Sequence, residues 1–341
     1  MGKVGPGILR EINRRMILKL IRQNQPISRK HLVSLSNLGK NTVSLIAEEL
    51  IMDDIIYEAY TENKKQVGRP TVALKFKEAA LPVLGIVLSH NKISGAVFDY
   101  SLTQLDKQTI DINEQEEYIE SLTSFIKKYT SKYELFGISI AVPGIVDTRN
   151  GVVIKSHRLR WYDFNLKEII EDIVDTRVYI CNTVKSIALL QYELGTTKSE
   201  TAFFMNIDKG LGGAYIDKSN VLYGKGGAAG EIGQLKMSMI NDNEDKTIES
   251  YYCELLKDED LACLSESKME KICEVLEGII EYINLLFDPE KIFLYGNVIQ
   301  NISKKSQNIQ FSSNVEICQK LDRNVAAAYS LINKYENDIT Y

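Results

Sequence analysis

Several features that would place a chain in a membrane or an oxidising compartment are missing from these 341 residues. No apolar run approaches the roughly 20 residues that a membrane-spanning helix needs. The first residues, MGKVGPGILREINRRM, contain no hydrophobic signal-peptide core. The five cysteines are scattered and odd in number, and no two of them form a C-x-x-C pair. This pattern argues against a disulfide framework and against a thiolate zinc site, and it predicts free thiols in a cytoplasmic protein.

Charge is distributed unevenly along the chain. Residues 1–80 contain 14 Lys and Arg against 8 Asp and Glu, whereas the remainder contains 27 against 38. The net charge of −5 therefore combines a head of +6 with a body of −11. A basic head favours contact with a polyanion, although solvated charge placed by chance would give the same balance.

Three short helices are predicted in the basic head. Apolar residues recur at helical spacing over residues 8–22, within SRKHLVSLS (28–36) and within KNTVSLIAEEL (40–50). Ser28 is placed to cap the second helix, and a tight turn around Gly39 joins it to the third. This arrangement is typical of a helix-turn-helix, but any small three-helix bundle would show the same periodicity.

The polar residues of this head favour the helix-turn-helix. In such a motif the recognition helix, which is the third predicted helix here, contacts base edges with its first turns. Neighbouring basic residues bind the phosphate backbone. Candidate DNA contacts are Arg29, Lys30, Lys40, Asn41, Thr42 and Ser44. Residues 55–60 and TVALKF (71–76) predict two strands joined by the basic turn TENKKQVGRP, which is the pattern of a wing.

Two glycine clusters dominate the stretch from 203 to 249. The first, in KGLGGA, lies between two apolar runs and predicts a strand, a tight turn and a second strand. The second, GKGGAAGEIGQL, contains the single carboxylate Glu231. Because glycine permits close backbone approach, the clusters suggest loops around a small ligand; plain turns are the alternative.

The rest of the body alternates strands and helices. Strands are predicted near 84–89, 93–100, 136–142, 178–181 and 292–296, and helices over 115–128, 166–174, 184–194, 272–286 and 321–332. Residues 77–82, KEAALP, are predicted to form a linker.

AVPGIVD (141–147), GLGGA (210–214) and AGEIG (229–233), in this order, resemble the ROK family of repressors and sugar kinases. The resemblance covers nearly the whole chain and is to the xylose-type and N-acetylglucosamine-type repressors. It implies an α/β protein with an N-terminal winged helix-turn-helix (1–76) on a two-lobed, actin-like, ribonuclease-H-like sugar-kinase body. The first lobe would comprise 83–181 plus 320–341, and the second 182–319.

The resemblance also implies partners. A homodimer or dimer of dimers would bind an inverted-repeat operator in double-stranded DNA, and a carbohydrate effector would bind between the lobes. Arg69 resembles the arginine that repressors of the family place in a narrow minor groove, where negative potential is focused. The resemblance implies no membrane partner.

The residues that a family kinase needs are replaced. Family kinases start the body with an aspartate, two glycines and a threonine. By resemblance, the corresponding residues here are Val87, Ser89, His90 and Asn91. In family kinases a catalytic aspartate follows the residue that corresponds to Asn182. Here that position is Thr183, whose hydroxyl is no base near neutral pH. We therefore expect no phosphoryl transfer and no cofactor. A sugar kinase with an accessory head, and a repressor without an effector, are the alternatives.

The sugar-binding positions are partly kept. The resemblance assigns ligand contacts to Arg158, Asn182, Thr183, Glu231, Gln234 and Glu249. Gln234 stands for the family's histidine and Arg158 for its asparagine. Gln234 is a poor metal ligand and only one cysteine, Cys253, follows nearby, so no zinc site is expected.

Two ambiguities concern the charged residues of this set. Glu231 is either a hydroxyl acceptor or a helix-start carboxylate that backbone amides satisfy. Arg158 either pairs with Glu231 or Glu249, which we favour, or recognises an anionic ligand.

Overall fold

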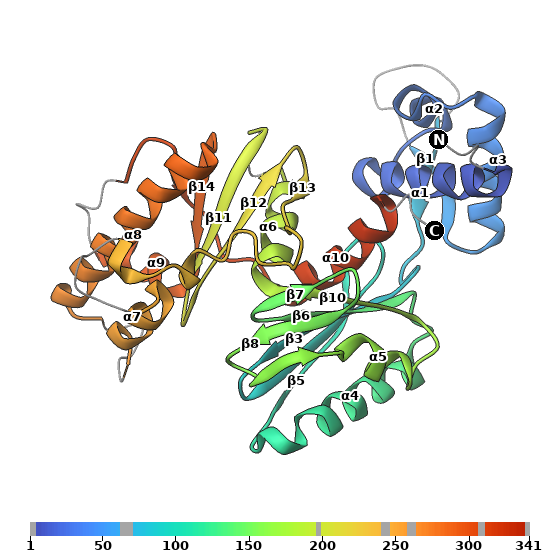
Figure 1. Ribbon diagram of the computed structural model, residues 1–341. Helices are drawn as coiled ribbons and strands as arrows, with labels where there is room; N and C mark the ends of the chain where they lie inside the picture. The colour runs from blue at the N-terminus through green and yellow to red at the C-terminus, as the bar shows by residue number, and fades with distance from the viewer. Residues whose placement is uncertain are drawn as a thin grey trace.

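The computed structural model describes residues 5–61, 71–195, 199–239, 246–257, 264–305 and 311–337. In this part of the chain a small helical head is followed by two lobes, each built on a five-stranded sheet (Figure 1). The chain is thus of the α/β class, as the sequence predicted.

The head forms the elements predicted for a helix-turn-helix with a two-stranded wing. They are α1 (Pro6–Asn24), α2 (Arg29–Ser36), α3 (Lys40–Met52), β1 (Ile56–Thr61) and β2 (Thr71–Phe76). Ser28 caps α2, because its hydroxyl accepts a hydrogen bond from the amide of His31. The helix ends at Ser36, and the left-handed backbone of the following Asn37 (φ 56°) turns the chain toward α3. β1 and β2 pair antiparallel, and residues 62–70 between them lie outside the described residues.

The first lobe contains a mixed sheet covered on both faces. Its strands are β3 (Val83–Ser89), β4 (Lys92–Phe98), β5 (Gln104–Asp111), β6 (Gly137–Val142) and β10 (Arg177–Asn182), in the order β10-β6-β3-β4-β5. Phe125 of α4 (Tyr118–Lys132, after a short 3-10 turn at Gln115–Glu117) packs on Gly95. On the other face a Cβ at Gly85 would lie 2.2 Å from the Asn324 carbonyl oxygen of α10 (Arg323–Asn337). Gly85 therefore lets α10 lie directly on the sheet.

The second lobe repeats the strand order of the first. Its strands are β11 (Thr201–Ile207), β12 (Leu211–Asp217), β13 (Asn220–Val221), β14 (Lys291–Tyr295) and β15 (Val315–Ile317), in the order β13-β12-β11-β14-β15. In both sheets the first strand is central, two antiparallel strands follow on one side, and two parallel strands complete the other. This duplication confirms the two-lobed, ribonuclease-H-like architecture.

Further helices and a small sheet complete the lobes. The second lobe carries α7 (Ile248–Leu255), α8 (Glu266–Phe287), α9 (Asn297–Lys305) and 3-10 turns at Ile232–Gln234 and Met237–Met239. The first lobe adds the antiparallel sheet β7 (Ile145–Asp147), β8 (Val152–Ser156) and β9 (Trp161–Phe164), followed by α5 (Leu166–Glu171). Helix α6 (Thr183–Glu193) lies between the lobes. No helix in the described residues is long and apolar enough to cross a membrane.

The first glycine cluster is only partly a turn. Gly210 ends the turn, but Gly212 and Gly213 lie within β12, which begins at Leu211. A Cβ at Gly213 would lie 2.5 Å from the carbonyl oxygen of Gly230. The glycines of the strand thus allow the second glycine loop to lie directly on β12, which the sequence did not reveal.

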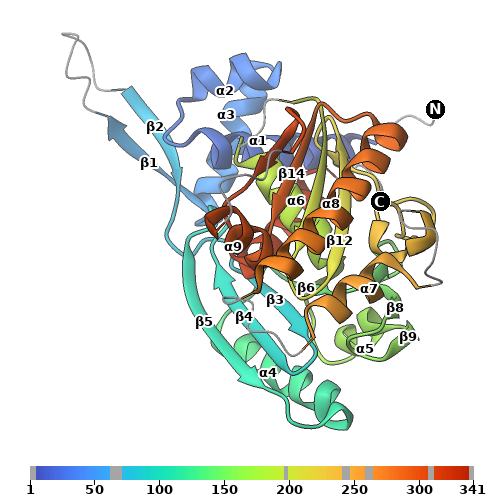
Figure 2. The same cartoon turned by 90° about the vertical axis from the view of Figure 1, so that its left-hand side faces the viewer.

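Head and first lobe share one hydrophobic core. Ile17 and Ile21 of α1 belong to the same buried cluster as Tyr100 of the first lobe and Ile332 of α10. The head lies against the body, as the turned view shows (Figure 2). The predicted linker is a packed turn, since the amide of Lys77 donates to the Ile55 carbonyl.

Candidate functional site

The site begins where β10 ends and α6 starts. Asn182, the last residue of β10, caps α6 by accepting a hydrogen bond from the Lys185 amide at 2.9 Å. Its side-chain amide donates to the Gly144 carbonyl at 2.6 Å and to Glu231 Oε1 at 3.4 Å. Asn182 therefore connects α6, the β6–β7 turn and the second glycine loop.

Lys185 is a site residue that the sequence reasoning missed. Its side chain is 1% exposed, although a lysine in the first turn of a helix ordinarily reaches solvent. The ammonium donates to the Gly227 carbonyl and lies 3.9 Å from Glu231 Oε1. Burial lowers the pKa of Lys185 below its usual value, and the charge of Glu231 opposes this. Lys185 therefore places a buried cation next to Glu231 of the second glycine loop.

Glu231 titrates near neutral pH. Burial raises the pKa of its carboxyl to about 7, with Lys185 opposing the rise and Glu249 adding to it. A carboxyl with such a pKa exists in both forms at physiological pH, so it can accept a hydrogen bond from a ligand hydroxyl or donate one to it. The interpretation of Glu231 as a carboxylate satisfied by helix-start amides is not what the structure describes: its described polar neighbours are side chains.

Thr183 places an unsatisfied hydroxyl in the same corner. The residue is 8% exposed, and its Oγ1 has no hydrogen-bond partner among the described residues. A buried hydroxyl without a partner costs about 1–3 kcal/mol of folding free energy. A polar ligand bound at the start of α6 would remove this cost.

Glu249, Gln234 and Arg158 gather on the other side of the site, around Gly210. Gln234 Nε2 donates to Glu249 Oε2 at 3.0 Å. A Cβ on Gly210 would lie 2.5 Å from a terminal nitrogen of Arg158 and 2.6 Å from Glu249 Oε1. Burial raises the pKa of Glu249, and the Arg158 guanidinium opposes this rise. Glycine at position 210 is thus what admits the two charged groups side by side.

The favoured pairing of Arg158 is only partly formed. Among the described residues its guanidinium is not within ion-pair distance of Glu231 or Glu249, although its charge acts on Glu249. Arg158 is half-buried, and His90 Nδ1 lies 2.9 Å from its carbonyl oxygen. The cation therefore lies beside Gly210, where its charge acts on Glu249.

An internal polar network occupies the first glycine turn. Asp208, which stands in the first glycine turn, forms an ion pair with Arg323 of α10 at 2.6 Å and accepts from Asn297 at 3.2 Å. Val87 is buried within β3, and Ser89 hydrogen bonds back to the Lys92 carbonyl. The carboxylate at 208 thus neutralises Arg323 of α10.

The candidate DNA contacts lie on the head. Lys30, Lys40 and Asn41 are exposed, whereas Thr42 and Ser44 are half-buried on α3. Arg29 forms an ion pair with Glu58 of β1, so a phosphate would have to compete with that carboxylate for it. Arg69 lies outside the described residues.

A comparison with family models and curated proteins finds the ROK family, whose model matches residues 83–263. The xylose repressor of Caldicellulosiruptor bescii is 28% identical over 245 residues, which cover 69% of this chain and 61% of that repressor. The chain thus spans about three fifths of the length of that relative. The N-acetylglucosamine repressor of Escherichia coli O6:H1 is 22% identical over 334 residues, covering 86% and 82%.

Solved structures share the fold. A ROK family transcriptional regulator that is a homologue of the Escherichia coli Mlc protein aligns with a TM-score of 0.75 at 20% identity, over 96% of this chain and 97% of its own. A ROK family glucokinase from Streptomyces griseus in complex with glucose and AMPPNP aligns with a TM-score of 0.54 at 17% identity, over 73% and 98%. The first alignment includes the head, and the second fits the length of the body.

Proposed function

We propose, since the chain belongs to the ROK family, that it is a DNA-binding transcriptional repressor of a carbohydrate-utilisation operon. The observation that carries the proposal is a head with an exposed recognition-helix start, joined through a shared core to a kinase-like body. We keep the division into residues 1–76, 77–82, 83–181 plus 320–341, and 182–319 as part of this proposal. The relatives named as xylose and N-acetylglucosamine repressors support it.

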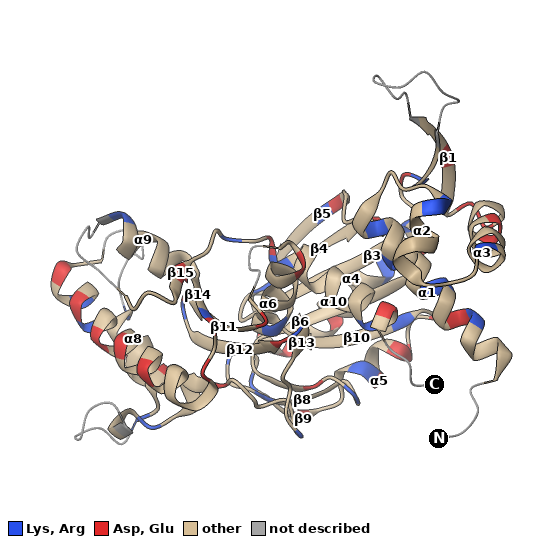
Figure 3. Ribbon diagram, turned by 90° about the horizontal axis from the view of Figure 1, so that it is seen from above, with Lys and Arg blue, Asp and Glu red and all other residues tan. Residues whose placement is uncertain are grey.

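The DNA partner follows from the head. Basic residues are drawn on α1 and α2, whereas most of the charged residues drawn on α8 of the far lobe are acidic (Figure 3). This polarity would orient the head toward a polyanion. A homodimer, or a dimer of dimers, would present two α3 helices to half-sites about 34–36 Å apart or a multiple of that distance.

Substitutions in the head should separate affinity from specificity. Arg69→Ala should weaken operator binding and lessen the preference for A·T-rich flanks, whereas Asn41→Ala should relax base preference by about 1–3 kcal/mol at one position. The measurement is a shift assay at several salt concentrations, with DNA selected by the unmodified protein from a random library. Lys127→Ala, which removes a cation from the exposed face of α4, is the control. Unchanged binding by both head variants would refute the assignment of the head.

The effector is proposed to be a sugar or sugar derivative. The site offers hydroxyl-binding groups of three kinds: the amide of Asn182, the carboxyls of Glu231 and Glu249, and the unsatisfied hydroxyl of Thr183. A polyol can satisfy all of these at once. Bound between β10–α6 and the glycine loops, it would favour one closure of the lobes through its differential affinity for the two states.

Arg158 decides the charge of the ligand. If the guanidinium recognises an anionic group, calorimetry should find that a phosphorylated sugar binds more tightly than the neutral one, and that Arg158→Ala removes this preference. If it only balances Glu249, the neutral form of xylose, glucose or N-acetylglucosamine should bind as well or better. No binding by a broad panel of neutral and phosphorylated sugars would favour a repressor without an effector.

Phosphoryl transfer is excluded from the proposal. The reaction needs a carboxylate to take the hydroxyl proton and an open loop for the phosphates, and here Thr183 and the Asp208–Arg323 pair occupy those positions. We expect no turnover in a coupled ATPase assay with hexoses or amino sugars. Thr183→Asp alone should not create activity, because Ser89 and His90 would still obstruct the phosphates. Turnover above background by the unmodified protein would overturn the non-enzymatic interpretation.

A further inference from the structure

Two helices run to the head from the candidate site around Asn182 and Glu231, which is called the cleft below. α6 begins at Asn182 and Thr183 in the site and ends at Glu193. α10 begins at Arg323, which pairs with Asp208 of the second lobe, and ends just beyond Glu336. The two helices pack against each other, and together they lie between the lobes and the head (Figure 1). Both therefore contact the cleft at one end and the head at the other.

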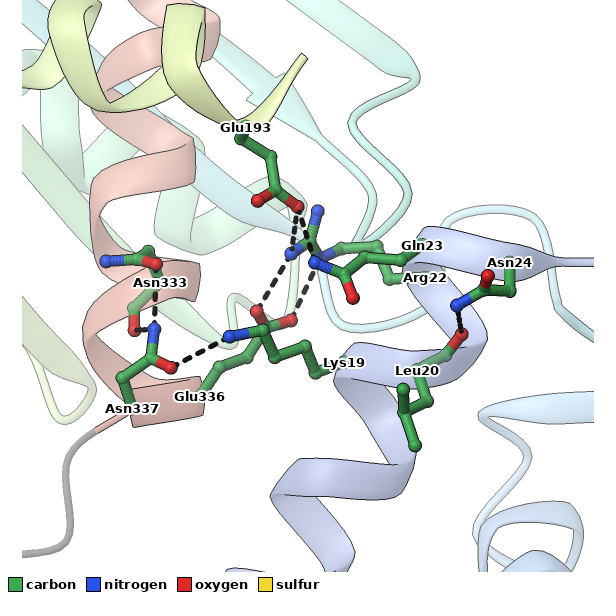
Figure 4. A network of polar contacts seen from close by, with 9 residues as sticks. All are labelled: Lys19, Leu20, Arg22, Gln23, Asn24, Glu193, Asn333, Glu336 and Asn337. Carbon is green, nitrogen blue, oxygen red and sulfur yellow. Dashed lines mark hydrogen bonds and ion pairs between the residues drawn. The ribbon is translucent and has the colours of Figure 1, made fainter. Parts of the chain in front are cut away.

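Arg22 of α1 joins the ends of these two helices. Its Nε and Nη2 donate to the two oxygens of Glu336 at 2.8 Å each, and Nη2 also donates to Glu193 Oε1 at 2.9 Å (Figure 4). Gln23 donates to the same oxygen of Glu193 at 3.0 Å. Side-chain exposure is 5% for Arg22, 0% for Glu336 and 20% for Glu193. One buried guanidinium thus binds both helices at once.

Further contacts support the attachment of α1 to α10, whereas the polar contact of Arg22 with α6 depends on Glu193. Arg15 donates to the Tyr335 carbonyl at 3.2 Å and lies over its ring, and Lys19 donates to Asn337 at 2.9 Å. These contacts and the shared hydrophobic core fix α1 on α10. A shift of α6 relative to α10 would therefore be felt by the head mainly at Arg22.

α6 can transmit a displacement from the site at its start to Glu193 at its end. Residues on all sides of it are buried, including Lys185 near its start and Leu190 near its end. Its 11 residues form a rod about 16 Å long, and a packed rod moves as a unit. Asn182 and Lys185 couple its start to Glu231 and Gly227 of the glycine loop.

We propose that Arg22 is the joint through which the state of the cleft sets the position of the DNA-binding head. In one state Glu193 binds Arg22 and Gln23, as here; a displacement of α6 breaks this bond while the bond to Glu336 persists. The inference rests on the proposed function, since it assigns the regulation of the same cleft. It supplies the two-state element that any ligand effect on the head requires.

The test uses the full-length chain without DNA or sugar, so it is independent of both parts of the proposed function. Amide hydrogen exchange is measured over α1 (Pro6–Asn24), with α4 (Tyr118–Lys132) as the reference. Asn182→Ala should raise exchange in α1 about fivefold or more, the lower end of typical coupling between sites, and leave α4 unchanged. In the Glu193→Ala background the same change should add less than about twofold.

Glu193→Ala keeps a strong helix former at this position, so α6 should still fold. Lys19→Ala is the matched control, because it removes a head–body contact to α10 and should leave the response to Asn182→Ala intact. Three outcomes would each overturn the proposal for Arg22. Asn182→Ala could raise exchange in α1 equally with Glu193 present and with Glu193→Ala, it could leave exchange in α1 unchanged, or it could raise exchange in α4 as much as in α1. Failure of operator or sugar binding in the earlier assays would leave this result unaffected.

Discussion

Arg22→Met is expected to destabilise the folded chain by about 3–5 kcal/mol, because it leaves a buried carboxylate without its partner. Glu336 has no exposed side-chain surface, and two of its bonds go to Arg22. Burial opposes the charge on Arg22, but Glu336 outweighs it and holds the pKa of the guanidinium above its usual value. The measurement is the free energy of unfolding in urea, followed by circular dichroism.

The double variant Arg22→Met/Glu336→Leu tests the cause. Replacing both members of a buried ion pair by apolar residues is often neutral or stabilising, so most of the loss should be recovered. If the double variant is as unstable as the single one, the loss comes from packing of the arginine stem and not from the orphaned carboxylate. A single variant as stable as the unmodified chain would show that Glu336 is not buried in solution.

Gly227→Ala is expected to lower the affinity for sugar at least about 100-fold, the largest effect we predict at the cleft. The residue has a φ of +79°, and a Cβ there would lie 2.0 Å from the Val146 carbonyl oxygen, which is backbone and cannot rotate away. The loop would have to move, and it would carry the acceptor of Lys185 with it. Calorimetry with the tightest-binding sugar of the panel measures the loss.

Gly226→Ala is the matched control for this prediction. Nothing lies within 4 Å of a Cβ at Gly226, and its φ is outside the left-handed region. The control should therefore keep the thermal midpoint and the sugar affinity of the unmodified protein. In Gly227→Ala both the thermal midpoint and the sugar affinity should be lower. Equal behaviour of the two variants would contradict the close approach of the loop to β7, whatever the ligand is.

The head was predictable because its information is local. Apolar spacing of three and four residues, the Ser28 cap and the turn before α3 are all set by neighbours in the sequence, and the structure confirms each of them. The same is true of α8, whose apolar stripe is continuous. The short strands β7, β8 and β9 were not predicted, because three to five residues carry too little alternation to be recognised.

The polar partners at the cleft and the joint could not be predicted. Lys185 lies in NTVKSIALL, where its place in the first helical turn indicates a solvated cation; its burial depends on Gly227, 42 positions later. Arg22 counted toward the basic charge of the head, yet its partner Glu336 is 314 positions away. Such contacts depend on how α6, α10 and the glycine loop assemble, which the family motifs do not encode.

The shared core of head and body has a consequence for how such a protein can evolve. A head that is attached by a loose tether can be exchanged between bodies by recombination, because nothing in either part depends on the other. Here α1 carries Arg15 and Arg22, which match Tyr335 and Glu336 at the opposite end of the chain. A crossover anywhere between them would separate a buried charge from its counter-ion, so the two termini are expected to be inherited as a pair.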